Sequence, residues 1–143
     1  MHLQGILDIE LKEFEHPWTK NQILNDILST SNSENLVYLF GYKVVGYLMG
    51  KKVLDEFHLH NIAVHSDYKR KKIGSFLINH LIEILLKQKI QLIFLEVSAH
   101  NYPAIKFYNK FGFKINGYRN DYYSKGDHAI LYKLNLVKYG RMV

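Results

Sequence analysis

Residues 73–97 read IGSFLINHLIEILLKQKIQLIFLEV, a helical pattern followed directly by a strand pattern. Apolar side chains recur at helical spacing in the first part, which predicts a helix from Ile73 to about Lys87. Residues 92–97 are then apolar on both faces apart from Glu96, which is typical of a central parallel strand covered on both sides. A helix before such a strand forms the crossover of a β–α–β unit. This stretch therefore predicts an α/β fold with a parallel pair of strands at its centre.

The flanking segments supply further elements. Thr19 and Gln22 have the spacing of a capping box, with Trp18 and Ile23 in the flanking positions of a hydrophobic staple, so we expect a helix from Lys20. Its apolar face is expected to carry Ile23, Leu24, Ile27 and Leu28. The helix should end in the short polar run 29–35, which is an ordinary connection and no domain linker.

Strand patterns surround the central unit. They cover residues 36–40 and 43–49, joined in an antiparallel hairpin through Gly41, then 53–64, and finally 113–118 and 129–136. Within 53–64 the apolar phase shifts between Leu59 and Ile62, which predicts a β-bulge near His60 and Asn61. A second crossover helix is expected from near Pro103 to before Gly112.

Composition limits the function. The chain has 143 residues, 48% of them hydrophobic, and we expect residues 1–143 to form one domain. The sequence contains no cysteine, which excludes thiol nucleophiles and thiolate zinc sites. It contains no apolar run of membrane-spanning length and no signal-like amino terminus, so we expect a cytoplasmic protein. The net charge of +6 favours an anionic partner such as nucleic acid, a phosphorylated cofactor or an acidic protein.

A basic segment precedes the central helix. It comprises Lys69, Arg70, Lys71, Lys72, Ile73, Gly74 and Ser75. The free amides and positive dipole end of a helix amino terminus, surrounded by cationic side chains, suit a pyrophosphate. A solvated basic turn and a nucleic-acid patch are the alternatives.

Two side chains are candidates for proton transfer. Glu96 is a lone carboxylate at the end of an apolar strand, where a general base and a structural salt bridge are equally reasonable. Tyr108 lies on an apolar helix face with Ala104, Ile105 and Phe111, so core packing is its default interpretation. His58 and His60 are two apart on one strand face, which is more typical of an exposed row than of a metal site, and we expect no metal.

Several motifs, taken together, resemble the GNAT family of acetyl-CoA-dependent N-acetyltransferases. They are residues 61–64 (NIAV), 69–74 (KRKKIG), 95–97 (LEV), Asn101 and 104–113 (AIKFYNKFGF), with support from 16–19 (HPWT), 54–56 (LDE), Arg119 and 122–123 (YY). Order and spacing both match, from about Ile9 to Leu136. Within the family the chain is most similar to the RimI-type enzymes, which acetylate the amino-terminal alanine of a small-subunit ribosomal protein.

The resemblance implies roles for individual residues. Glu96 would be the general base and Tyr108 the general acid of direct acetyl transfer in a ternary complex. The acetyl and pantetheine portion of acetyl-CoA would contact Ile62, Ala63 and Val64, with Asn101 on the pantetheine arm and residues 69–75 around the pyrophosphate. Tyr122 and Tyr123 would line the acceptor groove, with strand packing as the alternative. The implied fold is a mixed, mostly antiparallel sheet with a parallel β–α–β core flanked by helices.

The chain also departs from the family pattern. Lys69 and Lys72 replace the first and fourth members of the usual phosphate loop, and Lys72 would be strained if it had to adopt a positive φ. No counterpart of the family's first strand is evident before residues 6–14, which leaves open whether the sheet lacks one edge strand. A short loop at residues 124–128 also differs.

The acceptor is the least determined part of the assignment. Another protein terminus, a lysine or a small amine are alternative acceptors. A nucleic-acid-binding module or an acyl-CoA sensor is the alternative from another class, although we expect neither direct nucleic-acid binding nor a membrane partner.

Overall fold

The computed structural model describes residues 2–14, 17–28 and 32–137. In chain order its elements are α1 (Leu3–Glu13), α2 (Lys20–Leu28), β1 (Ser33–Phe40), β2 (Lys43–Val53), β3 (Glu56–Val64), a short 3-10 helix (Ser66–Tyr68), α3 (Ile73–Lys87), β4 (Leu92–Ser98), α4 (Tyr102–Lys110), β5 (Lys114–Ser124) and β6 (Asp127–Asn135). His16 of the motif at 16–19 and residues 29–31 of the polar run lie outside the described residues.

The strands form one six-stranded sheet in the order β1-β2-β3-β4-β6-β5. β3 and β4 pair in parallel, with α3 as their crossover, and all other neighbouring strands are antiparallel. This confirms the mixed, mostly antiparallel sheet with a parallel β–α–β core. In the part of the chain that the structure describes, no strand precedes α1, and β1 is an edge of the sheet.

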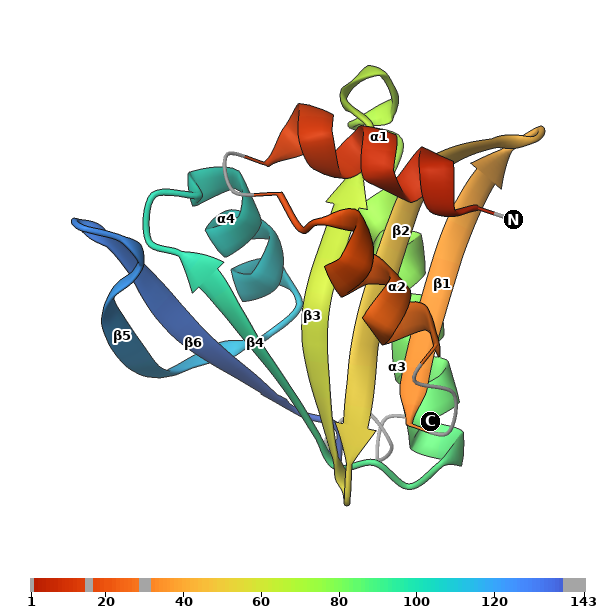
Figure 1. The fold of residues 1–143 in the computed structure, drawn as a ribbon. Helices are drawn as coiled ribbons and strands as arrows, with labels where there is room; N and C mark the ends of the chain where they lie inside the picture. Colours follow the sequence, from red (N-terminus) through yellow and green to blue (C-terminus); the bar gives the residue numbers. More distant parts are fainter. Residues whose placement is uncertain (1, 15–16, 29–31, 138–143) are drawn as a thin grey trace.

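Helices cover the two faces of the sheet unequally. α1 and α2 lie over β1, β2 and β3 in the front of Figure 1, whereas α3 lies behind the sheet. The smaller core cluster accordingly joins Ile6, Ile9 and Ile23 to Tyr47 and Met49 of β2. The larger cluster joins α3 and α4 to the opposite face. None of the helices that the structure describes lies in front of β4, β5 or β6, so these strands leave that face open (Figure 1).

The start of α2 confirms the predicted capping box. The Thr19 amide donates to the Gln22 side chain at 2.8 Å, and the Gln22 amide donates to the Thr19 hydroxyl at 3.2 Å. The expected apolar face is partly wrong, because Leu28 is 68% exposed and Asp26 is buried. Helical spacing gives the width of an apolar stripe, but the angle at which α2 lies on the sheet decides which side chains are buried.

Several strand predictions need correction at their ends, and the one over 113–118 becomes β5, which extends to Ser124. Val53 belongs to β2, and the chain turns through Leu54 at φ 57° before β3 begins. The predicted loop at 124–128 is shorter, since Asp127 and His128 belong to β6 and Asp127 pairs with Ser124 of β5. The bulge is confirmed: Gly50 pairs with Leu59 and Met49 with Asn61, which leaves His60 as the extra residue.

The second crossover connects two strands that are not neighbours in the sheet. α4 connects β4 to β5, but β6 lies between these two strands in the sheet. The β5–β6 hairpin therefore projects beyond β4 on the side away from β3 (Figure 1).

Candidate active site

The two central parallel strands separate part of the way along their length. Their pairing ends at Leu59 and Leu95. Beyond that point β3 pairs only with β2, up to Val64, and β4 pairs only with β6, up to Ser98. Each strand therefore presents one edge of unpaired backbone N–H and C=O groups toward the gap, and such groups need partners. An extended ligand with amide groups of its own can supply them.

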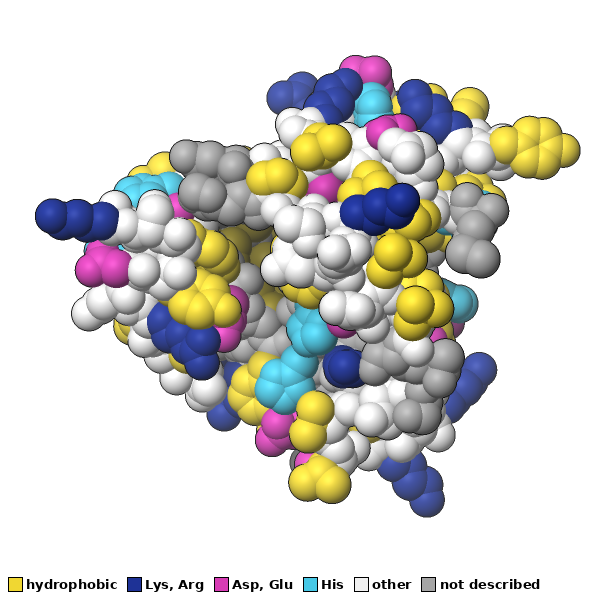
Figure 2. Space-filling model, in the orientation of Figure 1, with side chains coloured by type: hydrophobic (Ala, Val, Ile, Leu, Met, Phe, Trp, Pro, Cys, Tyr) yellow, Lys and Arg dark blue, Asp and Glu magenta, His cyan; other side chains and the backbone are white. Residues whose placement is uncertain are grey.

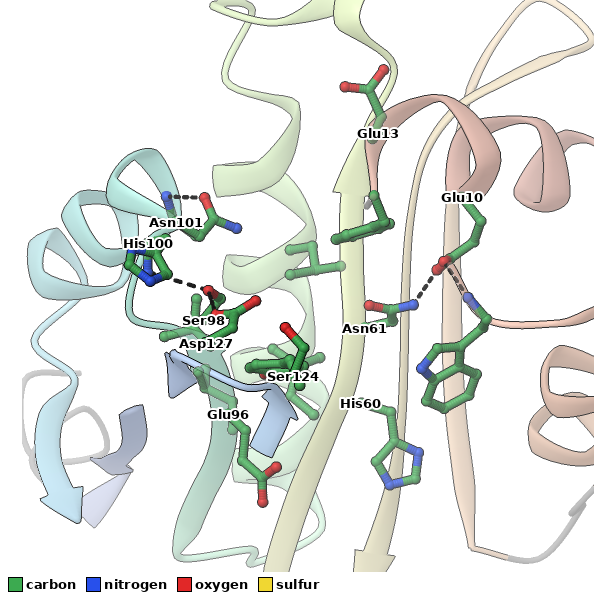
Figure 3. A pocket seen from close by; sticks show the side chains of 18 of the residues that line it. Glu10, Glu13, His60, Asn61, Glu96, Ser98, His100, Asn101, Ser124 and Asp127 are labelled. Atoms are coloured by element: carbon green, nitrogen blue, oxygen red, sulfur yellow. Dashed lines mark hydrogen bonds between the residues drawn. The ribbon is translucent and has the colours of Figure 1, made fainter. Parts of the chain in front are cut away.

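A cleft of about 610 Å³ opens at this separation. Figure 2 shows the hollow between the β5–β6 hairpin and the α1–α2 layer, and Figure 3 shows side chains that line it. The lining includes Glu10, Glu13, Trp18, His60, Asn61, Ile62, Glu96, Ser98, Asn101, Tyr108, Tyr123 and Asp127. The structure thus brings the predicted pair Glu96 and Tyr108 to one cavity.

Glu96 differs from the expectation that its strand is covered on both sides. Alternate residues of β4, Ile93, Leu95 and Val97, are buried against the α3 side. Glu96 points to the other face, where no helix covers β4, and its side chain is 32% exposed. The described helices cover β4 on one face only, although Leu92 and Phe94 make the other face apolar as well, so the predicted buried carboxylate is instead a solvent-reachable one.

An arginine holds the Glu96 carboxylate. The Arg119 guanidinium nitrogen lies 3.5 Å from a Glu96 oxygen, and the same guanidinium lies 5.0 Å from the centre of the Tyr122 ring. The pKa of the Tyr122 phenol is raised, chiefly because it interacts with the Glu96 carboxylate. The salt bridge considered as an alternative role for Glu96 is therefore present, but it leaves the carboxylate at the cleft wall.

Tyr108 is part of the core and of the cleft at once. Its ring is 7% exposed and contacts the rings of Phe107, Phe113 and Tyr132 at centroid distances of 5.5, 5.5 and 6.1 Å. Its hydroxyl makes no hydrogen bond to another described residue. Burial raises the pKa of Tyr108, so its phenol, which is protonated at neutral pH even at the ordinary pKa of about 10, stays protonated in more alkaline solution as well. Core packing is confirmed, and it leaves a protonated hydroxyl available in the cleft.

The predicted contacts of the acetyl and pantetheine portion are distributed over both faces of β3. Ile62 lines the cleft, Ala63 is buried in the α1–α2 cluster, and Val64 packs against the α3 cluster. A contact of Ala63 or Val64 with a cleft ligand would therefore use backbone groups. Asn101 lines the cleft and also caps α4, accepting from the Ala104 amide at 3.3 Å.

The basic segment 69–75 borders the cleft without lining it. Lys69 forms an ion pair with Glu13 at 3.1 Å, and Glu13 does line the cleft. Lys69 and the Ser66 amide hold the pKa of Glu13 below its ordinary value against the opposing effect of burial. Arg70 and Lys72 adopt positive φ values of 66° and 61°, so the strain anticipated at Lys72 is present. Lys72 ends this turn as the N-cap residue of α3.

The two predicted acceptor-groove tyrosines are placed differently. Tyr123 lines the cleft, and burial raises the pKa of its phenol. Tyr122 is 47% exposed and contacts Tyr123 edge-on at 5.0 Å. Only Tyr123 faces the cavity directly.

Glu10 is a site residue that was not predicted. It is fully buried, accepts from the Trp18 amide at 2.9 Å, and also accepts from the Tyr47 hydroxyl and the Asn61 amide group. Burial raises its pKa. Glu10 thus ties α1 to the segment before α2 and to the bulge of β3. The signal in the sequence was a carboxylate four residues after Ile6 on a buried helix face.

The two strand histidines do not form one exposed row. His58 contacts Glu56 at 3.1 Å and stacks on Phe94, whereas His60 lines the cleft and contacts Asp26 at 3.0 Å. Across residues 2–14, 17–28 and 32–137 no group of three His, Cys, Asp or Glu side chains could hold a metal ion. Within the same ranges no helix is long and apolar enough to cross a membrane.

The family model described as Acetyltransferase (GNAT) family matches residues 3–113, which include the split strands and most of the cleft. The chain therefore belongs to the GNAT family. The ribosomal protein bS18-alanine N-acetyltransferase of Escherichia coli strain K12 is 33% identical over 125 residues, which cover 87% of this chain and 83% of that protein.

Solved structures agree with this assignment. The crystal structure of the ribosomal-protein-S18-alanine N-acetyltransferase from Escherichia coli matches with a TM-score of 0.87 at 31% identity, over 94% of this chain and 87% of that one. Ard1 from Thermoplasma volcanium matches with a TM-score of 0.86 at 26% identity, over 93% of this chain and 90% of that one.

Proposed function

We propose that this acetyltransferase modifies the amino-terminal alanine of a small-subunit ribosomal protein in the cytoplasm, with acetyl-CoA as the acetyl donor. The observation that carries the proposal is the cleft at the strand split, which holds a reachable carboxylate and a protonated phenol. The named activity of the Escherichia coli relatives supports the choice of acceptor.

The open strand edges fit the donor. Backbone groups of Ile62, Ala63 and Val64 face the gap with no strand partner on that side, and they would hold the acetyl and pantetheine portion. Asn101 lies at the other wall and would contact the pantetheine arm. Residues 69–75 at the amino end of α3 would hold the pyrophosphate through backbone amides, with the helix dipole and cationic side chains favouring negative charge.

The chemistry follows from the two side chains. Glu96 takes a proton from the attacking nitrogen, directly or through a water that the open face of β4 admits. The nitrogen attacks the thioester carbonyl, and the carbon–sulfur bond breaks as the tetrahedral intermediate collapses. Tyr108 donates its proton to the departing thiolate, since a phenol carries its proton at neutral pH. No covalent enzyme intermediate is needed.

An amino terminus is the easier acceptor to activate. An α-amino group with a pKa of about 7.7 to 8.0 is roughly 10 to 15% neutral at pH 7, whereas a lysine side chain is about 0.04% neutral. A terminal alanine therefore needs less help from the protein than a lysine does.

The test compares two peptides. One copies the amino terminus of the ribosomal protein, and the other has that terminus blocked and its lysines free. Acetyl transfer only to the free terminus is the expected result. Transfer to the blocked peptide would contradict the proposed acceptor in favour of lysine, and transfer to neither would contradict it altogether.

A further inference from the structure

An imidazole at the bulge of β3 is oriented by a buried carboxylate. His60 Nδ1 lies 3.0 Å from an oxygen of Asp26, which is 6% exposed on α2. The second Asp26 oxygen is buried without a hydrogen-bond partner in the described structure. A carboxylate at Asp26 accepts this hydrogen bond from Nδ1–H, and in a neutral imidazole so bonded Nε2 keeps its lone pair.

The bulge and a neighbouring ring determine where this imidazole lies. His60 follows Leu59, the last β3 residue paired with β4, and it lines the cleft. The Trp18 ring lies 5.8 Å from the imidazole and restricts its orientation. In Figure 3, His60 and Glu96 project from the two separating strands toward the same end of the cleft.

We propose that His60, oriented by Asp26, is the catalytic group that takes the first proton from the ammonium of the acceptor. This inference rests on the proposed function and deepens it. The acceptor nitrogen must lose two protons. In this scheme each proton goes to a different base, and the two bases lie on the two strands that flank the split.

The proton balance is as follows. The N–H bond of the ammonium breaks and His60 Nε2 gains that proton, which yields a neutral amine and an imidazolium still bonded to Asp26. The amine attacks the thioester carbonyl, and Glu96 takes the second nitrogen proton as the amide forms. The carbon–sulfur bond breaks, and the thiolate receives the proton of Tyr108. Solvent returns a proton to Tyr108 and removes those on His60 and Glu96.

Charged groups of both signs surround the cleft, where Lys69 pairs with Glu13 and Arg119 pairs with Glu96. Besides His60, the titratable side chains that line the cleft are Glu10, Glu13, Glu96, His100, Tyr108, Tyr123, Lys125 and Asp127. Carboxylates outnumber the cationic groups in this set, and Asp26 adds a further one in direct contact with His60. An imidazole is also the side chain whose charge changes most readily near neutral pH.

The test measures kcat/KM for the alanine peptide at pH 7 and at about pH 9.5 in His60→Gln, with His58→Gln as the matched control on the same strand. We expect His60→Gln to lose about seven- to tenfold at pH 7, where only roughly 10 to 15% of the α-amino group is neutral, and almost nothing at about pH 9.5, where that group is already neutral. The KM for acetyl-CoA and the His58→Gln rates should stay within about twofold of wild type. Asp26→Asn should lose about threefold at pH 7, as a positioning residue.

Two results would overturn the inference. One is a His60→Gln rate within twofold of wild type at pH 7, and the other is an equal loss at both pH values, which a purely structural role would produce. Should the wild-type protein acetylate no peptide, the proposed function fails, and the nitrogen NMR spectrum of histidine-labelled protein decides the role of His60 separately. A hydrogen on Nδ1, together with a change in the Nε2 chemical shift when the alanine peptide is added, supports the role of His60. A hydrogen on Nε2, or an unchanged Nε2 chemical shift, contradicts that role.

Discussion

Arg119 and Glu96 form an ion pair across an intervening strand. Glu96 lies on β4 and pairs with Leu131 of β6. Arg119 lies on β5 and pairs with Ala129, which also belongs to β6. The 3.5 Å contact therefore spans β6 on the open face of the sheet. The arginine pairs with the carboxylate at the cleft wall and leaves its side chain 32% exposed.

Glu96→Gln should lower kcat by roughly 100-fold or more, because an amide cannot accept the nitrogen proton. Arg119→Gln should lower kcat by a smaller factor, since it leaves the base in place but less well held. Steady-state rates with the alanine peptide measure both effects. Wild-type turnover in Glu96→Gln would exclude this residue as a base.

Tyr108→Phe should lower kcat by at least about tenfold with little change in the KM for acetyl-CoA, because it removes only the hydroxyl that donates to the thiolate. The hydroxyl has no hydrogen bond to another described residue and the ring contacts remain, so the melting temperature should change by only a few degrees. Tyr118→Phe, at a 64% exposed position, is the control. Equal rates in the two variants would remove Tyr108 from the mechanism.

Stability should fall as the pH rises above about 10. Burial raises the pKa values of Tyr47, Tyr108 and Tyr123 in the folded protein. The unfolded phenols lose their protons first, at a pKa of about 10. This ionisation stabilises the unfolded state, whereas the buried phenols of the folded state stay protonated, so the free energy of unfolding falls. Urea unfolding at pH 8 and pH 11 measures this loss. Tyr108→Phe should reduce it, and an unchanged pH dependence would contradict the burial of this phenol.

Lys72→Gly should stabilise the fold by up to about 1 kcal/mol, because glycine adopts the left-handed conformation found at φ 61° without strain. The same change removes one cation near the expected pyrophosphate, so the KM for acetyl-CoA should rise a few-fold. Lys71→Gly removes the same charge from a residue with negative φ and should destabilise the protein instead. Chemical unfolding and donor titrations separate the two effects, and equal stability changes would refute the strain at Lys72.

Glu10→Ala should destabilise the protein by roughly 2 to 3 kcal/mol, because it leaves the Trp18 amide, the Tyr47 hydroxyl and Asn61 without their buried acceptor. The matched control is Asp8→Ala on the exposed side of the same helix, which should change stability by less than about 0.5 kcal/mol. A small effect of Glu10→Ala in urea unfolding would show that these three groups find other partners.

Local sequence determined much of the fold. The limits of α3 at Ile73 and Lys87, the capping box of Thr19 and Gln22, and the bulge at His60 match their patterns. Each of these depends on residues close together in the chain, through helical spacing, a side chain bonded three residues away, or a shift in strand alternation. Motif order also brought Glu96 and Tyr108 correctly to one cleft.

Tertiary structure alone decided which faces are covered. Glu96 is reachable because α1 and α2 lie over β1 to β3 and leave β4 open, which no pattern within residues 92–97 reveals. Asp26 and Glu10 occupy apolar helix faces, and their partners His60 and Asn61 lie 34 and 51 residues away. A buried polar group is tolerated only where such a distant partner satisfies it. Burial and pairing therefore depend on contacts that only the folded chain creates.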